Sequence, residues 1–249
     1  MSIGVFCPVS RQEYPLLQFT LRPFIKSVAA KCILILHTGR SPHPDFGSVA
    51  STSSCVVELH RDFGESYEES VENGGYDQFS ARNFAIEYIE KTGVEWIVQF
   101  DADQYLTERA VSIIADTSDR YDVIVFPYYT LISKTEFWYE PRIKRVINGS
   151  ALIDPHLLIW RRALEKRNEL CSRSAELHAN QTRHCSVSFL NHPRWRIRVV
   201  HEFSHFHLHC LLGKKNSSLR RQGLKFGEPL PEDMLFCLEQ LDAAKLTRS

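Results

Sequence analysis

Residues 95–103 read Glu-Trp-Ile-Val-Gln-Phe-Asp-Ala-Asp, an apolar run that ends in two aspartates separated by one alanine. The run predicts a buried strand, and Asp101 and Asp103 follow it in the turn. Two carboxylates at positions i and i+2 beyond a strand can share a divalent cation, or divide between a cation and a ribose hydroxyl. Taken alone, however, the pattern is more often a solvated turn than a metal site.

Strands and helices are predicted to alternate over the first half of the chain. Such alternation, with strands that are apolar throughout, is typical of a mostly parallel sheet covered by helices on both faces. Sheets of this kind bind ligands beyond the carboxyl ends of their strands, which is where the two aspartates lie. Pro8 is expected to close the first strand and Pro23 to interrupt the first helix. The predicted strands are residues 3–7, 32–36, 55–59, 96–100 and 123–127, and the predicted helices are residues 16–28, 78–91 and 108–115.

The alternation of strand and helix patterns is weaker after residue 128. Residues 138–147 suit a pair of strands, residues 157–170 a helix, and residues 195–212 either a strand or a helix. Residues 228–244 predict a C-terminal helix that is entered through two prolines.

The composition is that of an ordinary soluble globular protein. Of 249 residues, 43% are hydrophobic and 24% are charged, which argues against a disordered chain. Lys and Arg together number 30, and Asp and Glu together also number 30, so the formal net charge is zero. No global field then draws the protein to nucleic acid, and we expect no nucleic-acid partner.

The cysteines and the N-terminus indicate a reducing compartment. The seven cysteines include no Cys-x-x-Cys pair, and Cys7, Cys32 and Cys55 fall in strand-like runs, so we predict reduced core thiols. The first residues lack the features of a signal peptide, and no window approaches the roughly 18 apolar residues of a membrane span. We therefore expect a cytoplasmic protein without a transmembrane segment, for which a peripheral membrane contact stays open.

Two further stretches make the acidic turn more specific. Residues 79–86 read Phe-Ser-Ala-Arg-Asn-Phe-Ala-Ile, and the first strand leads into the turn Cys7-Pro8-Val9-Ser10. Together with residues 95–103, they resemble the inverting family 2 glycosyltransferases of the GT-A fold, over roughly residues 3–127. The resemblance implies an α/β, GT-A (Rossmann-like) fold with a mostly parallel central sheet and a C-terminal acceptor-side extension. Residues 1–127 would then be the nucleotide-sugar-binding half, and residues 128–249 the acceptor-binding and catalytic half.

The resemblance also implies a donor site. Pro8 and Ser10 would lie at the nucleotide, Ser10 and Arg82 helping to seat its base and ribose, and Asp101 would touch the ribose or the cation. Asp103 would ligate the metal, Mn²⁺ or Mg²⁺. Lys214, in a basic stretch, would close over the diphosphate, although solvated charge is an equal interpretation.

The sequence departs from the family pattern at two positions. The turn after the second strand is His37-Thr38-Gly39, where the family usually has an Asp-rich turn that reads the base. Gln104 stands where an acidic residue often follows the aspartate pair. The identity of the nucleotide is therefore open.

A histidine-rich segment offers a rival interpretation. His201-Glu202-Phe203-Ser204-His205 matches the His-Glu-x-x-His pattern of zinc peptidases, in which a helix places both histidines on one face. Residues 196–209 also alternate, however, which suits a strand, and a strand would separate His201 from His205 too far for that geometry. A zinc hydrolase is kept as an alternative.

By the resemblance, the same segment supplies the chemistry. Glu202 would be the general base that takes the proton of the acceptor hydroxyl, with Asp154 as the second candidate, and His207 or His205 would be a further metal ligand. The predicted function is metal-dependent, inverting transfer from a nucleotide-sugar donor to a hydroxyl of a glycan, a lipid-linked acceptor or another glycoconjugate, as in polysaccharide biosynthesis. A non-catalytic nucleotide-sugar-binding domain is the remaining alternative.

Overall fold

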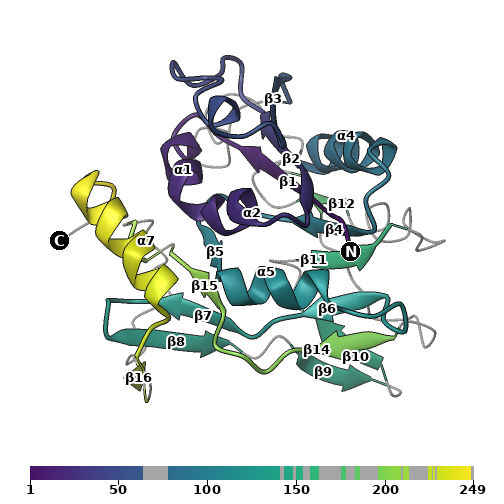
Figure 1. Cartoon of the computed structure of the whole chain (residues 1–249), viewed down its shortest axis with the longest axis vertical. Helices are drawn as coiled ribbons and strands as arrows, with labels where there is room; N and C mark the ends of the chain where they lie inside the picture. The colour runs from purple at the N-terminus through teal and green to yellow at the C-terminus, as the bar shows by residue number, and fades with distance from the viewer. Residues whose placement is uncertain are drawn as a thin grey trace.

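Figure 1 shows the chain as a computed structural model, in which helices pack on a large sheet and a second sheet lies beside it. The structure describes residues 1–63, 78–140, 143–147, 150–153, 158–162, 175–177, 183–185, 196–208, 210–212, 224–225, 227 and 229–247.

The large sheet has seven strands in the order β14-β6-β11-β4-β1-β2-β3. Neighbouring strands are parallel except at β11, which runs antiparallel to both β4 and β6. The predicted α/β fold with a mostly parallel sheet is therefore confirmed. The strands are β1 (Ile3–Val9), β2 (Ala30–His37), β3 (Val56–His60), β4 (Trp96–Gln99), β6 (Val123–Val125), β11 (Leu158–Arg161) and β14 (Ile197–Val199).

Helices cover both faces of this sheet. Successive side chains of a strand point to opposite faces, so each strand contributes to two hydrophobic cores. On one face Phe6 and Leu34 pack with Ala85 of α4, and on the other Val5 and Ile33 belong to a second core with α1, α2 and α5. The helices are η1 (Tyr14–Leu16), α1 (Leu17–Thr20), α2 (Arg22–Lys26), η2 (Ala50–Thr52), α4 (Gln78–Lys91), α5 (Glu108–Ala115) and α7 (Glu232–Ala243).

The second sheet has five strands in the order β16-β8-β7-β15-β5, and α7 lies against it (Figure 1). The contact is anchored by Tyr105, whose hydroxyl donates to the carbonyl of Asp233 at 3.0 Å. These strands are β5 (Gln104–Leu106), β7 (Tyr128–Leu131), β8 (Glu136–Glu140), β15 (His205–His207) and β16 (Leu224–Lys225), and two hairpins pair β9 (Ile143–Ile147) with β10 (Ser150–Ile153) and β12 (Ala175–Leu177) with β13 (Arg183–Cys185).

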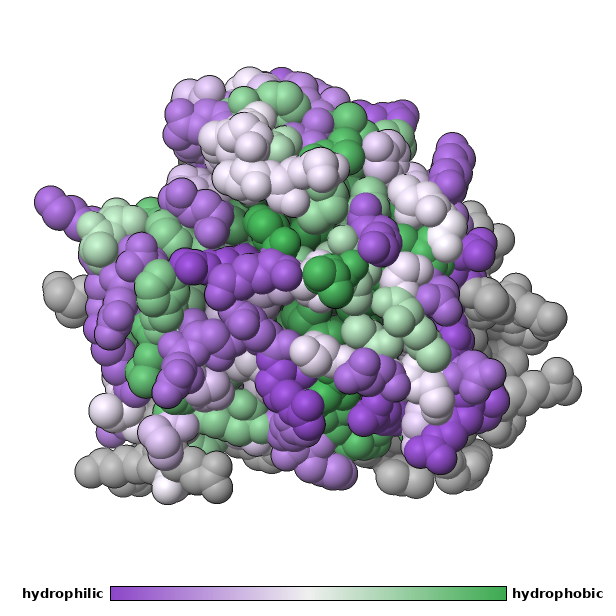
Figure 2. Space-filling view, viewed as in Figure 1, coloured by the Kyte–Doolittle hydropathy of each residue, from purple (hydrophilic) through white to green (hydrophobic). Residues whose placement is uncertain are grey.

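Hydrophilic residues cover much of the face shown in Figure 2, and apolar residues appear between them in separate clusters. Among the helices that the structure describes, none combines the length and the apolar composition needed to span a bilayer. The five cysteines with described side chains are free thiols, and Cys7, Cys32 and Cys237 lie in the core as the sequence predicted, whereas Cys55 and Cys210 are only partly buried.

Most of the predicted elements of the first half are confirmed, with small shifts at their ends. The helices at residues 78–91 and 108–115 have the predicted bounds, and α1 ends before Leu21, close to Pro23. The first strand does not end at Pro8 but continues to Val9. Pro8 is tolerated because β1 pairs with β4 only as far as Phe6, so the absent N–H of Pro8 breaks no ladder.

The predicted helix at residues 157–170 is wrong in its described part. Residues 158–161 form β11, and Ile159 and Trp160 are almost completely buried between β4 and β6. A short apolar run reads the same in a buried strand and on a helix face, so periodicity alone could not separate them. The predicted strands at residues 138–147 exist as parts of β8 and β9, but each pairs with a different partner.

Candidate functional site

The acidic turn lies at the carboxyl end of β4, in the middle of the large sheet. The backbone N–H of Phe100 still donates to Phe6 of β1, so the chain leaves the sheet only at Asp101. The N–H of Gln104 then donates to the carbonyl of Asp101 at 3.0 Å, which closes a tight turn into β5. Both aspartates are thus fixed at the sheet edge where α/β folds bind ligands.

Asp101 is held from two sides. The Arg82 guanidinium, from α4, lies 3.5 Å from Asp101 Oδ1, and its side chain is only 8% exposed. The Gln104 side-chain amide donates to Asp101 Oδ2 at 3.3 Å. Arg82 is therefore a buried partner of the acidic turn and not a solvated residue of the helix surface.

Asp103 is paired with His207. The two residues meet because β15 runs antiparallel to β5, with His207 opposite Gln104, and the N–H of Leu208 donates to the carbonyl of Asp103 at 2.8 Å. His207 Nε2 lies 3.2 Å from Asp103 Oδ2, and both side chains are mostly buried. Of the two histidines predicted as metal ligands, the structure brings His207 to the turn, whereas His205 is fully buried opposite Leu106.

Other groups close to the turn come from the end of β1. Ser10 is buried there, and its hydroxyl donates to Glu13 Oε2 at 2.9 Å. Pro8 lies one strand position before Val9, in the same stretch.

Cys7 lies beneath this cluster of charges. Burial raises the pKa of the Cys7 thiol, and the negative charges of Asp101, Glu13 and Asp103 raise it further, while Arg82 acts in the opposite direction. The thiol therefore stays neutral.

A divalent cation fits the chemistry of this turn. Within the described residues, no three His, Cys, Asp or Glu side chains converge closely enough to form a metal site by themselves. Mg²⁺ and similar ions, however, are commonly held by one or two carboxylates together with substrate phosphates and water. Asp101, Asp103 and His207 are candidates for the one or two protein ligands of such an ion, and phosphates and water would complete its coordination.

Glu202, the predicted base, lies elsewhere. The N–H of Thr107 donates to the carbonyl of Ser204, so Glu202 is beyond the far end of the β5–β15 pair from Asp103. Its carboxylate accepts two hydrogen bonds from Arg109, at 3.3 and 3.5 Å. Asp103 and Thr107 flank the two ends of β5 and lie four residues apart, about 13 Å at about 3.3 Å per residue, so the structure does not bring Glu202 to the acidic turn.

The zinc-peptidase alternative is wrong. His201 and Glu202 lie in irregular backbone and His205 begins strand β15, so no helix places the two histidines on one face. His201 is exposed and His205 is fully buried. The second predicted base, Asp154, and the predicted phosphate-closing Lys214 lie outside the described residues.

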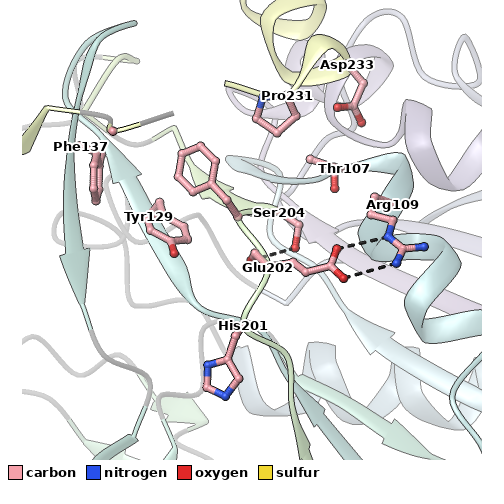
Figure 3. Close-up of a pocket in the computed structure, with 11 residues that line it drawn as sticks. Thr107, Arg109, Tyr129, Phe137, His201, Glu202, Ser204, Pro231 and Asp233 are labelled. Carbon is pink, nitrogen blue, oxygen red and sulfur yellow. Dashed lines mark hydrogen bonds and ion pairs between the residues drawn. The ribbon is translucent and has the colours of Figure 1, made fainter. Parts of the chain in front are cut away.

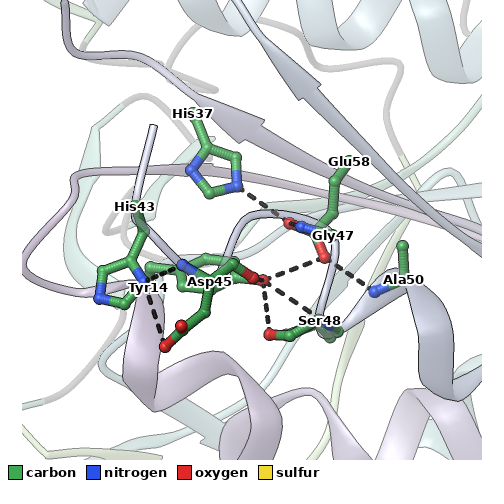
Figure 4. Close-up of polar contacts among 9 residues, drawn as sticks. Tyr14, His37, His43, Asp45, Gly47, Ser48, Ala50 and Glu58 are labelled. Carbon is green, nitrogen blue, oxygen red and sulfur yellow. Dashed lines mark hydrogen bonds and ion pairs between the residues drawn. The ribbon is translucent and has the colours of Figure 1, made fainter. Parts of the chain in front are cut away.

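A buried network shapes the loop that follows β2 (Figure 4). The Glu58 carboxylate of β3, 1% exposed, accepts from the N–H groups of Gly47 and Ala50 at 2.9 and 2.8 Å. It also lies 3.1 Å from both His37 Nε2 and the Tyr14 hydroxyl. The loop therefore has a fixed shape where it leaves the carboxyl end of β2, beside Val9.

Sequence reasoning missed several of these groups. Gln104 was noted only as a departure, although its amide positions Asp101, and Glu58 was not singled out, because its partners lie in segments distant in the sequence. A glutamate in an otherwise apolar strand, opposite a strand that ends in His37, was the available hint.

No protein-family model matches the sequence, and no curated protein matches it. Among solved structures, S. aureus TarS 1-349 in complex with UDP-GlcNAc is similar with a TM-score of 0.57 and 15% identity, over 98% of this chain and 66% of that one. TarS 1-349 in complex with UDP gives 0.52 and 16%, over 84% and 60%. TarS itself gives 0.53 and 16%, over 84% and 37%. This chain thus spans less than two thirds of the TarS chains, and it has their GT-A-like α/β fold.

Proposed function

We propose that this chain is a metal-dependent, inverting glycosyltransferase that moves a sugar from a nucleotide-sugar donor to a hydroxyl of a glycan or another glycoconjugate. The observation that carries the proposal is the pairing of Arg82 with Asp101 and of His207 with Asp103 at the carboxyl end of β4. The fold supports it, because the similar TarS structures hold UDP-GlcNAc and UDP.

These groups suit the departure of a nucleoside diphosphate. Negative charge develops on the leaving phosphate, and preorganised positive groups stabilise it because they need no rearrangement during the reaction. A bound Mg²⁺ or Mn²⁺ would supply most of that stabilisation. Asp103, His207 and Asp101 would hold the ion, while Arg82 fixes the orientation of Asp101 and adds its own charge. Ser10, at the end of β1, would meet the nucleoside.

Inversion requires a base for the acceptor hydroxyl on the side opposite the diphosphate. Glu202 and Asp154 remain the predicted candidates. The position of Glu202 beyond the far end of β5 argues against direct proton transfer at the acidic turn. Asp154 is therefore the candidate base to test first.

The test combines binding and turnover. Thermal unfolding is measured with UDP, GDP, CDP and TDP and with their sugars, each with Mn²⁺, with Mg²⁺ and without metal, because a ligand of the folded state raises the melting temperature. We expect one nucleotide class to stabilise the protein only with metal, and its sugar to be consumed when an acceptor is present. Binding without turnover on any acceptor would favour the non-catalytic alternative, and the absence of any nucleotide effect would contradict the proposal.

A further inference from the structure

A pocket of about 700 Å³ opens between the start of α5, the second sheet and the start of α7 (Figure 3). Its size falls within the range of small-molecule sites. Thr107 and Ser204 line it, and they lie at the opposite end of the β5–β15 pair from Asp103 and His207. The pocket is therefore separate from the proposed donor site.

One wall of the pocket is aromatic. The Tyr129 and Phe203 rings meet edge to face with centroids 4.5 Å apart, and Phe137 lies 5.4 Å from Tyr129 and 6.2 Å from Phe203 in the same manner. Figure 3 shows Tyr129 and Phe137 side by side on β7 and β8. All three rings are partly buried, so they hold one another in place while lining the pocket.

The facing side is polar and charged. Arg109 and Glu202 both line the pocket and form a forked pair, with side chains 68% and 43% exposed. Thr107 and Asp233 stand beside them (Figure 3). Because both side chains are partly exposed, their oxygens and N–H groups remain accessible to hydroxyl groups of a ligand.

We propose that this pocket binds a neutral saccharide, the sugar portion of the acceptor. An aromatic wall packs against the C–H face of a sugar ring, while a carboxylate and a guanidinium exchange hydrogen bonds with its hydroxyls. An anionic ligand is disfavoured, because Glu202 and Asp233 outnumber Arg109. The role as acceptor site rests on the proposed function, whereas saccharide binding itself does not.

The position of the pocket also limits the ligand. The chain segment that carries Glu202 and Phe203 continues directly into His207, so the pocket and the acidic turn lie at the two ends of one strand pair. The gap of about 13 Å between Asp103 and Thr107 requires an oligosaccharide rather than a single sugar if one ligand is to reach both.

The experiment measures saccharide binding directly, by saturation-transfer NMR with maltotriose, cellotriose and chitotriose, with and without UDP and Mn²⁺. Glu202→Gln keeps the size of the side chain and removes its charge. Lys26→Gln is the matched control, because Lys26 forms an exposed ion pair with Glu108 of α5 outside the pocket. We expect one trisaccharide to bind wild type and Lys26→Gln equally, and Glu202→Gln about tenfold more weakly, since a hydrogen bond to a charged group is lost.

The outcomes separate the two proposals. UDP binding without any saccharide binding would refute the proposed saccharide site and leave the proposed function intact. Displacement of the saccharide by UDP also overturns the pocket, because it would show that the sugar occupies the donor site. Saccharide binding that depends on Glu202 in a protein that binds no nucleotide would support the pocket and refute the proposed function. Melting temperature checks that both variants are folded, and Arg109→Gln provides a second probe of the same pair.

Discussion

His207 Nε2 lies 3.2 Å from Asp103 Oδ2, although the two residues are 104 positions apart in the chain. The contact exists because β15 returns from the edge of the large sheet and pairs with β5 directly after the acidic turn. It joins the acidic turn of the first half of the chain to the histidine-rich segment of the second half.

Asp103→Asn tests the proposed metal site. We expect about a 100-fold fall in kcat, the usual cost of removing one group that stabilises developing charge, and nucleotide binding that no longer responds to Mn²⁺. Turnover and melting temperature are measured with and without metal. Asp119→Asn, an exposed residue after α5, makes the same chemical change and should behave as wild type. A metal response that survives in Asp103→Asn would rule out this ligand.

Gln104→Glu tests how Asp101 is positioned. The variant replaces an amide that donates to Asp101 Oδ2 with a second carboxylate, and two like charges at this distance cannot both ionise easily. We expect the acidic limb of the profile of kcat/KM against pH to move upward by about one unit. Gln104→Met removes the hydrogen bond without adding charge and should lower activity at every pH without moving that limb. Identical profile shapes for the two variants would count against electrostatic positioning.

The Glu58 network should make folding sensitive to acid. Burial lowers the pKa of His37 below its ordinary value of 6.5, although Glu58 acts in the opposite direction. Burial raises the pKa of Glu58, but hydrogen bonds from Gly47, Ala50, His37 and Tyr14 outweigh it and hold the pKa below the ordinary 4.5. Both groups therefore bind fewer protons when folded, so their contribution is complete above about pH 6.5 and is lost as the pH falls.

The measurement is the free energy of unfolding between pH 7.5 and 4, by urea titration. Glu58→Gln should lower the free energy of unfolding by about 2 kcal/mol at pH 7.5, because the glutamine amide cannot accept from every donor that faces it. Between about pH 5 and 4, the variant should lose less unfolding free energy than wild type does. Glu13→Gln is a control carboxylate outside the network. If wild type and Glu58→Gln lose stability in parallel, the network does not carry the acid sensitivity.

Gly4→Ala should destabilise the fold. A Cβ at this position of β1 would lie 2.6 Å from Ile89 Cγ2 and 2.7 Å from Val94 Cγ2, so α4 would have to move away from the sheet. The cost of such overpacking is about 1–3 kcal/mol. Gly227→Ala, where the added Cβ meets no atom within 4 Å, is the control, and equal melting temperatures for the two variants would contradict the close approach.

The first half of the fold was predictable because its signals are local. The strand before Asp101 and the helix that carries Arg82 are continuous patterns with clear ends, and their conjunction indicated the GT-A fold. The second half was not predictable in the same way. Leu158–Arg161 reads equally well on a helix face, and only its neighbours β4 and β6 make it a strand.

The candidate site divides similarly. The resemblance implied Arg82, Asp101, Asp103 and either His207 or His205, and the structure pairs Arg82 with Asp101 and His207 with Asp103. The position of Glu202 could not be predicted, because it depends on the register of β15 against β5, and the aromatic pocket gave no pattern because Tyr129, Phe137 and Phe203 come from three separate segments.

The strand β11 has a consequence for how the protein can be made. It is inserted between β4 and β6, so a nascent chain that ends before residue 158 leaves the edge of β4 open, next to the acidic turn. Open apolar edges pair with other chains. A fragment ending at residue 127 contains the acidic turn and the Arg82 helix and yet should aggregate when expressed, whereas synthesis through β11 and β14 is needed before the sheet can close.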